Sequence, residues 1–178
     1  MRKILLLAFL LLPFVTEAQT FLSVNDLLNV RTSFLNHNKD WVQILRDRGY
    51  NKTQEIHGDQ YAYKNCRLTI LDDDPYRSDG QVVEADTKTA DASIVRFYED
   101  EFRMTTYFHI EVIVYGKSNA QKWIQQIKAL GYKSNNSAGS SGNGRNDWYY
   151  TKRGFPELHL MNKGTMFKLD VYIQGSGN

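Results

Sequence analysis

The side chains best suited to chemistry are four histidines and one cysteine. The histidines His37, His57, His109 and His159 show neither the paired spacing on a helix nor the His-rich tract of a zinc site. Cys66 would need a histidine such as His57 or His159 beside it to act as a nucleophile. In an alternating strand, however, Cys66 is in phase with Leu68 and Ile70, which predicts a small buried side chain.

An acidic run offers a second source of chemistry. Asp72, Asp73 and Asp74, with Asp79 and Gly80, carry several carboxylate oxygens, but their spacing departs from the alternating acidic loop that wraps calcium. A solvated turn is the better interpretation. The sequence also lacks a Gly-rich phosphate loop, a Gly-x-Ser-x-Gly elbow and a zinc-protease helix motif. It therefore predicts no cofactor and no metal site.

Residues 1–18 have the features of a cleavable signal peptide. Arg2 and Lys3 precede an apolar run, and Thr16-Glu17-Ala18 places small residues at the two positions that a signal peptidase reads. The apolar run is shorter than the roughly 20 residues that a membrane-spanning helix needs. We therefore expect a soluble exported chain that begins near Gln19, without a membrane span, in the periplasm or outside the cell.

The charge of the mature chain excludes one class of partner. Without Arg2, Lys3 and Glu17 the net charge of +2 becomes about +1, and the remaining basic residues are interleaved with acidic ones. Nucleic-acid binding would need a concentrated basic stripe, so it is not predicted. Because one cysteine cannot form an internal disulfide, the fold must depend on its core.

The chain contains matching segments that suggest an internal duplication. Three pairs occur in the same order: 41–50 with 123–132, 61–64 with 148–152, and 108–116 with 167–175. The first pair shares Trp, a Gln two residues later, and a closing Gly-Tyr. The sequence therefore predicts two related units: 19–116, which includes an acidic loop at 72–88, and 117–178, which includes a mobile Ser/Asn/Gly-rich loop at 134–146.

Each unit is expected to place helices before strands. In the second unit, Ser118 and Gln121 form a capping-box pattern at the start of a helix, which Gly131 ends. In the first unit the apolar stripe indicates two short helices with a joint at 33–38, the second ending at Gly49. Strands are predicted at 60–64, 66–71, 92–98, 108–116, 147–152, 157–161 and 167–175. The fold class is α+β, an antiparallel sheet with the helices packed on one face.

This duplicated plan, carried by the Trp41/Trp123 and Phe108/Phe167 segments, resembles the tandem α/β fold of secreted β-lactamase inhibitor proteins. That family presents an aromatic-rich sheet surface to an enzyme, but this chain lacks the family's disulfides, so inhibition is not carried over. The same segments, with their Gly-Tyr helix endings, are also similar to uncharacterised exported Bacteroidetes proteins, which imply no function.

A binding surface is predicted on the sheet face away from the helices. The helix-facing positions of the strands are apolar, the outer faces of the helices carry Lys, Gln, Asp and Arg, and only the outer sheet face combines aromatic side chains with both charge signs. A flat surface with rigid aromatic anchors suits a protein or peptide better than a small molecule. The residues predicted to form it are His109, Glu111, Tyr115, Tyr149, Lys168, Asp170 and Tyr172.

The resulting hypothesis is an exported, non-catalytic binding protein with a protein or peptide partner. One alternative is an exported hydrolase whose site is assembled by folding, from His57, Cys66 and His159 or from an Asp and Glu pair. Another is a structural component of an exported assembly, which would show a self-complementary apolar patch.

Overall fold

The computed structural model describes residues 21–53, 59–64, 66–72, 82–102, 105–135 and 147–177. The predicted signal peptide therefore lies outside the described residues, as do His57, Asp73, Asp74, Asp79, Gly80 and most of the predicted loop at 134–146.

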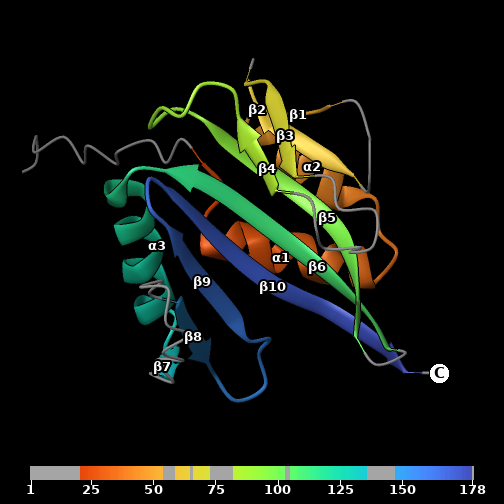
Figure 1. Cartoon of the computed structure of the whole chain (residues 1–178). Helices are drawn as coiled ribbons and strands as arrows, with labels where there is room; N and C mark the ends of the chain where they lie inside the picture. Colours follow the sequence, from red (N-terminus) through yellow and green to blue (C-terminus); the bar gives the residue numbers. More distant parts are fainter. Residues whose placement is uncertain are drawn as a thin grey trace, which may run out of the picture.

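The centre of the molecule is an eight-stranded antiparallel sheet (Figure 1). Its strand order is β1-β2-β5-β6-β10-β9-β8-β7. Each half of the chain contributes four strands, and the halves meet where β6 pairs with β10. The bounds are β1 Tyr50–Lys52, β2 Gln60–Tyr63, β5 Ser93–Phe102, β6 Thr105–Tyr115, β7 Lys133–Asn135, β8 Asp147–Thr151, β9 Leu158–Lys163 and β10 Met166–Gly177.

Three helices cover one face of this sheet. They are α1 (Val24–Leu35), α2 (Asp40–Asp47) and α3 (Lys117–Ala129). Leu27, Leu45 and Ile127, one from each helix, share a buried core with Val112 of β6 and Leu169 of β10. The fold is therefore the predicted α+β class, with antiparallel strands and the helices on one side.

The helix ends confirm some sequence signals and correct another. Gly49 and Gly131 follow α2 and α3 with φ of 84° and 83°, the left-handed conformation that glycine adopts without strain. The predicted capping box at Ser118 is wrong, because α3 begins one residue earlier with Gly116 as its N-cap and no side-chain cap. A capping box is instead present at Ser23 and Asp26, where α1 begins.

A second, two-stranded sheet lies over one end of the other face. It consists of β3 (Leu68–Asp72) and β4 (Val82–Ala85). The prediction that 72–88 is all loop is therefore wrong for Asp72, which ends β3, and for β4. Val83 and Ala85 pack on Ile113 and Tyr115 of β6 in a second, smaller apolar cluster. The end of the sheet that sequence analysis left open to solvent is therefore covered here.

The strand order is symmetric about the β6–β10 pair, as a duplicated unit would be. Within that pair, Glu111 lies directly opposite Asp170, and these are also equivalent positions in the matching segments 108–116 and 167–175. Trp123 is buried, whereas Trp41 is only partly buried against the same core. The duplication itself stays a prediction.

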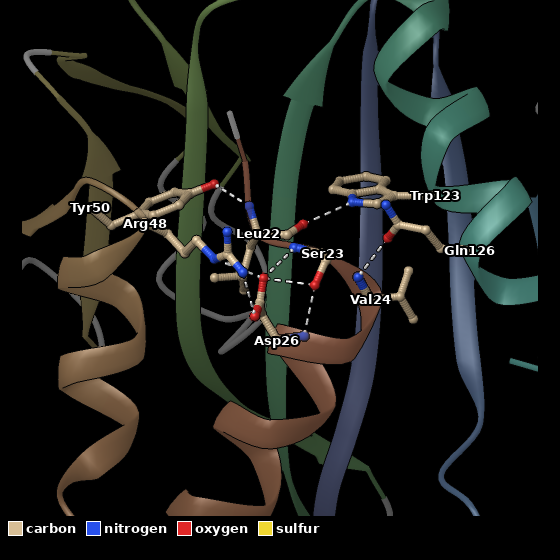
Figure 2. Close-up of polar contacts among 8 residues, drawn as sticks. All are labelled: Leu22, Ser23, Val24, Asp26, Arg48, Tyr50, Trp123 and Gln126. Atoms are coloured by element: carbon tan, nitrogen blue, oxygen red, sulfur yellow. Dashed lines mark hydrogen bonds and ion pairs between the residues drawn. The ribbon is translucent and has the colours of Figure 1, made fainter. Parts of the chain in front are cut away.

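The segment that leads into α1 contacts both halves of the chain (Figure 2). The Trp123 indole N–H donates to the Leu22 carbonyl at 3.1 Å, and the Val24 N–H donates to the Gln126 side chain at 2.9 Å. From the other half, the Tyr50 hydroxyl accepts from the Leu22 N–H at 3.4 Å. Leu22 and Val24 are themselves buried in the core, so this segment is part of the folded structure.

Candidate functional site

All seven residues predicted to form the binding surface lie on the face of the sheet opposite the helices, here called the outer face. Strand alternation puts them there, because Ile110, Val112, Leu169 and Val171 belong to the helix-facing core and their sequence neighbours point the other way. Tyr149 of β8 is likewise flanked by Trp148 and Tyr150, which pack on that core.

The register of the sheet aligns polar residues of the outer face across six strands. Each is directly opposite the next on the neighbouring strand. We call this set the polar row: Gln60 (β2), Arg96 (β5), Glu111 (β6), Asp170 (β10), His159 (β9) and Tyr149 (β8). Because cross-strand neighbours on one face lie about 5 Å apart, the row concentrates charge at the middle of the sheet.

Glu111 is the centre of an ion-pair cluster in the polar row. Its Oε1 is 3.3 Å from Nη1 of Arg96, and Nζ of Lys168 lies 3.2 Å from both of its carboxylate oxygens. All three side chains are buried. Taking charges out of water is costly, so such a cluster is tolerated only when the charges compensate one another, as two cations around one carboxylate do here in part.

Asp170 pairs with His109 instead. The His109 Nδ1 lies 3.0 Å from the Asp170 Oδ2, and the imidazole is stacked against Tyr98 at a ring-centroid distance of 4.8 Å. Tyr172 packs on the same imidazole at 4.4 Å. The ring is therefore held by one carboxylate and two aromatic side chains.

The other end of the row has a similar aromatic contact. His159 stacks on Tyr149 with ring centroids 4.1 Å apart and an angle of 9° between the planes. Its Nε2 lies 3.8 Å from the Asp147 Oδ2, which is too long for a hydrogen bond.

Most of the residues predicted to form the binding surface are buried rather than open to solvent. His109, Glu111, Lys168 and Asp170 are buried, and Tyr115 is buried beneath β4, where its hydroxyl accepts from the Ala85 N–H at 2.6 Å. Tyr172 is the most open of the seven, with 38% of its surface exposed. Tyr149 is half-buried.

Burial also changes the proton affinities of this face. It raises the pKa of Asp170, against a smaller opposing effect of the hydrogen bond from His109. It lowers the pKa of His159, with the nearby Asp147 carboxylate acting in the opposite direction. Burial likewise raises the pKa of Tyr149, and the carboxylates of Asp147, Glu157 and Asp170 add to the increase. In each case the charged form is the one disfavoured by desolvation.

Several buried polar atoms of the outer face have no hydrogen-bond partner. They include Gln60 Nε2, His109 Nε2, Asp170 Oδ1 and His159 Nε2. A buried polar atom without a partner costs free energy, so a native protein usually satisfies it. Within the described part of the chain, no three His, Cys, Asp or Glu residues are arranged to hold a metal ion, and no described helix is long and apolar enough to cross a membrane.

Sequence analysis missed three members of the polar row: Gln60, Arg96 and His159. The signal was present for the last two, because Val95 and Phe97 in one strand and Leu158 and Leu160 in another are apolar and face the helices. Alternation alone puts Arg96 and His159 on the outer face. The row itself depends on strand register, which the sequence does not contain.

The other residues considered for chemistry do not join this site. Cys66 is half-buried against the small apolar cluster beneath β3 and β4, and burial raises the pKa of its thiol. This agrees with a packing role. His37 is exposed at the end of α1.

Comparison of the chain with protein-family models, with curated proteins and with solved structures gave no match.

Proposed function

We propose that the chain is an exported, non-catalytic binding protein whose partner, a protein or peptide, contacts the outer face around the polar row. The observation that carries this proposal is the row itself, in which charged and aromatic side chains lie side by side across the middle of the sheet. The export part of the proposal depends on the signal peptide predicted at residues 1–18.

The position of the row favours binding of a macromolecule. Its residues are on neighbouring strands of a continuous sheet and most of them are buried. The partly open side chains that pack on them are therefore already held in position, and little conformational entropy is lost on association. Tyr149 in the row and Tyr172 beside it are aromatic residues that are partly open to solvent. Tyrosine is common among residues that dominate binding energy, because it buries a large rigid ring and keeps a polar hydroxyl.

The experiment is affinity capture of a partner from periplasmic extract and culture supernatant, followed by affinity measurements with purified partner. We expect Tyr172→Ala and Tyr149→Ala each to weaken binding, and at least one of them to lose roughly 2 kcal/mol or more, the threshold for a hot spot. Phe155→Ala is the matched control, because Phe155 is 50% exposed but contacts Tyr132 of the helix-side core.

Circular dichroism must first show that each variant stays folded. Unchanged affinity in both tyrosine variants, with loss in Phe155→Ala, would move the binding surface to the β8–β9 connection and contradict the proposal.

A second candidate, an exported hydrolase, is favoured by one observation. Converging ionisable side chains are the mark of a catalytic site, and the 3.0 Å pair of His109 Nδ1 with the Asp170 carboxylate is the arrangement that orients a histidine as a general base. Its Nε2 is buried, so a substrate would reach it only after the outer face opens. Hydrolysis of a generic ester that disappears in His109→Gln would favour this candidate over binding.

A further inference from the structure

A histidine and a carboxylate of the outer face lie just beyond hydrogen-bonding distance of each other. Nε2 of His159 on β9 is 3.8 Å from Oδ2 of Asp147 on β8. We propose that protonation of His159 turns this contact into an ion pair that ties β8 to β9 and holds the Tyr149 ring in place. The outer face would then have a pH-dependent ion pair at its β8 side, in addition to the ion pairs of Glu111.

Both groups have unsatisfied hydrogen-bonding capacity. Within the described part of the chain, His159 Nε2 and Asp147 Oδ1 are buried atoms without a hydrogen bond. The Asp170 carboxylate is directly opposite His159 on β10, but it is bonded through Oδ2 to His109 at 3.0 Å. Asp147 is therefore the described carboxylate that His159 contacts.

The sheet register brings the two side chains together. His159 is directly opposite Tyr149, which is two residues from Asp147 on β8, so Asp147 and His159 are diagonal neighbours on one face. A charge-assisted N–H···O bond is about 2.8 Å long, so a movement of about 1 Å completes the pair. The Asp147 side chain is 33% exposed, against 13% for His159, and it has the room to supply that movement by rotation.

Protonation supplies the donor and the charge that the pair needs. A neutral imidazole has a hydrogen on one of its two nitrogens, whereas a protonated imidazole has one on each, so Nε2 must then donate. Burial lowers the pKa of His159, and the Asp147 carboxylate acts in the opposite direction. His159 is therefore neutral at neutral pH, and the pair forms in acidic solution, below the ordinary value of 6.5.

The other charged groups near His159 do not take the place of Asp147. Lys163 and His109 oppose its protonation, and Glu111, which favours it, is already paired with two cations. Tyr149 stays neutral, because burial raises its pKa. The titratable and charged groups of the outer face on the strands around His159 are Glu111 and His109 on β6, Asp147 and Tyr149 on β8, Lys163 on β9, and Lys168, Asp170 and Tyr172 on β10.

The ion pair would act on Tyr149 through the stacked rings. The rings of His159 and Tyr149 are parallel to within 9°, with centroids 4.1 Å apart. A positive charge on the imidazole adds cation–π attraction to this stack, and the bond to Asp147 fixes the position of the imidazole. Because Tyr149 is half-buried, its ring transmits the change to the surface.

The corresponding place on the other side of the β6–β10 pair contains a permanent cation. Arg96 is directly opposite Glu111 on β6, as His159 is directly opposite Asp170 on β10. Arg96 is paired with Glu111 at 3.3 Å, and an arginine stays charged in proteins. The same position of the sheet therefore has a fixed charge on one side and a titratable group on the other.

The ion pair also bears on binding at the outer face. A partner that contacts Tyr149 would meet a more rigid ring in acidic solution, so less conformational entropy would be lost on association. This consequence rests on the proposed function, whereas the ion pair is a property of the chain alone. An experiment on the chain alone can therefore reject the ion pair and leave the proposed function to the Tyr149 and Tyr172 variants.

The test is an NMR pH titration of the mature chain that follows the His159 imidazole and the Tyr149 ring. We expect Asp147→Asn to lower the proton affinity of His159 about threefold or more, because the carboxylate that raises its pKa is lost. Glu157→Gln is the matched control. It removes an equal charge that acts on Tyr149, whereas the groups that shift the pKa of His159 do not include Glu157, so the His159 titration should stay unchanged.

The motion of the Tyr149 ring is a second measurement, which a purely electrostatic effect of Asp147 would not change. Acidification should slow the flipping of this ring in the unaltered chain, measured from its aromatic line shapes, and have no such effect in Asp147→Asn. His159→Phe keeps a ring against Tyr149 but cannot be protonated, so it should also remove the response to pH. This variant tests the same point if Asp147→Asn does not fold.

Equal effects of Asp147→Asn and Glu157→Gln on the His159 titration would overturn the ion pair, because charge would then act without a contact. Ring motion of Tyr149 that is the same at both ends of the titration would also overturn the proposal. So would a response to pH of equal size in the unaltered chain and in His159→Phe.

Discussion

His159 should make the stability of the protein depend on pH. Burial lowers the pKa of its imidazole below the usual 6.5 in the folded state, so the unfolded chain takes up a proton at higher pH than the folded one. Above pH 6.5 the imidazole is neutral in both states, so it adds no pH dependence to the free energy of unfolding. As the pH decreases through 6.5, the unfolded state is protonated first and the free energy of unfolding falls. We expect His159→Gln to lose part of this decrease, measured by denaturant unfolding at about pH 7.5 and about pH 5.5.

His37→Asn is the control for that measurement, because His37 is exposed and follows α1, which packs on the opposite face of the sheet. If His159→Gln unfolds with the same pH dependence as the unaltered protein, the assignment of this dependence to His159 is wrong.

The ion pairs of Glu111 predict that a conservative substitution at this residue strongly lowers the free energy of unfolding. Glu111→Gln leaves the Arg96 and Lys168 cations buried without the carboxylate that both contact. Removing one partner of a buried ion pair typically costs about 3–5 kcal/mol. Adding Lys168→Met to Glu111→Gln should recover part of this loss, because one uncompensated charge is then absent; equilibrium unfolding of the two variants decides it.

At the scale of the elements, two glycines in equivalent positions should respond differently to the same substitution. Gly49 and Gly131 both have positive φ, so alanine at either position costs about 1–2 kcal/mol of backbone strain. A Cβ at Gly49 would lie 3.1 Å from Cε2 of Tyr63, whereas at Gly131 nothing is within 4 Å. Gly49→Ala is therefore expected to be the more destabilising, measured by thermal and denaturant unfolding. Equal costs would mean that Tyr63 moves aside freely.

The two tryptophans of the matching segments are also expected to differ. Trp41 and Trp123 are equivalent positions in the matching segments, but of the two only Trp123 is buried, and its indole N–H donates a hydrogen bond to the Leu22 carbonyl. Trp123→Ala should cost about 3–5 kcal/mol. Trp41→Ala should cost less, because Trp41 is partly exposed. Equal losses of unfolding free energy would contradict this ranking.

The sequence predicted where helices and strands occur better than how they pair and pack. Apolar alternation located β6 and β10 and assigned His109, Glu111, Lys168 and Asp170 to one face, because strand period is a local property. It did not reveal β4, whose Val82–Ala85 segment follows the acidic run and Gly80 and so resembled a loop. Nor did it reveal that the polar residues are buried, because burial depends on which other parts of the chain pack against that face of the sheet.

The polar row was beyond prediction for a related reason. Arg96 and Glu111 are opposite each other only because β5 and β6 pair in one register, and a shift of that register by two residues would keep every side chain on its face while pairing different residues. The capping box predicted at Ser118 was wrong because a helix can also begin without a side-chain cap, as α3 does.

At the scale of the whole molecule, the two halves should unfold together. Residues of all three helices and of strands from both halves share one core, and Leu22 bonds to Tyr50 in one half and Trp123 in the other. We expect far-ultraviolet circular dichroism and tryptophan fluorescence to give coincident denaturation curves, the test of a two-state transition. Separate midpoints would show that the halves are independent units.

The pairing of β6 with β10 has a consequence for the order of assembly during synthesis. Among the described strands, β10 follows the other seven strands of this sheet in the sequence, yet it occupies the middle of the sheet. Until it emerges, β6 and β9 each lack a neighbour on their inner side, and the carboxylate of Glu111 lacks the cation of Lys168. Contacts between distant parts of a chain slow folding, and exposed strand edges invite pairing with other chains. The nascent protein therefore has two unprotected strand edges in the middle of its sheet until β10 has been synthesised, which makes this interval the one in which a chaperone would be most useful.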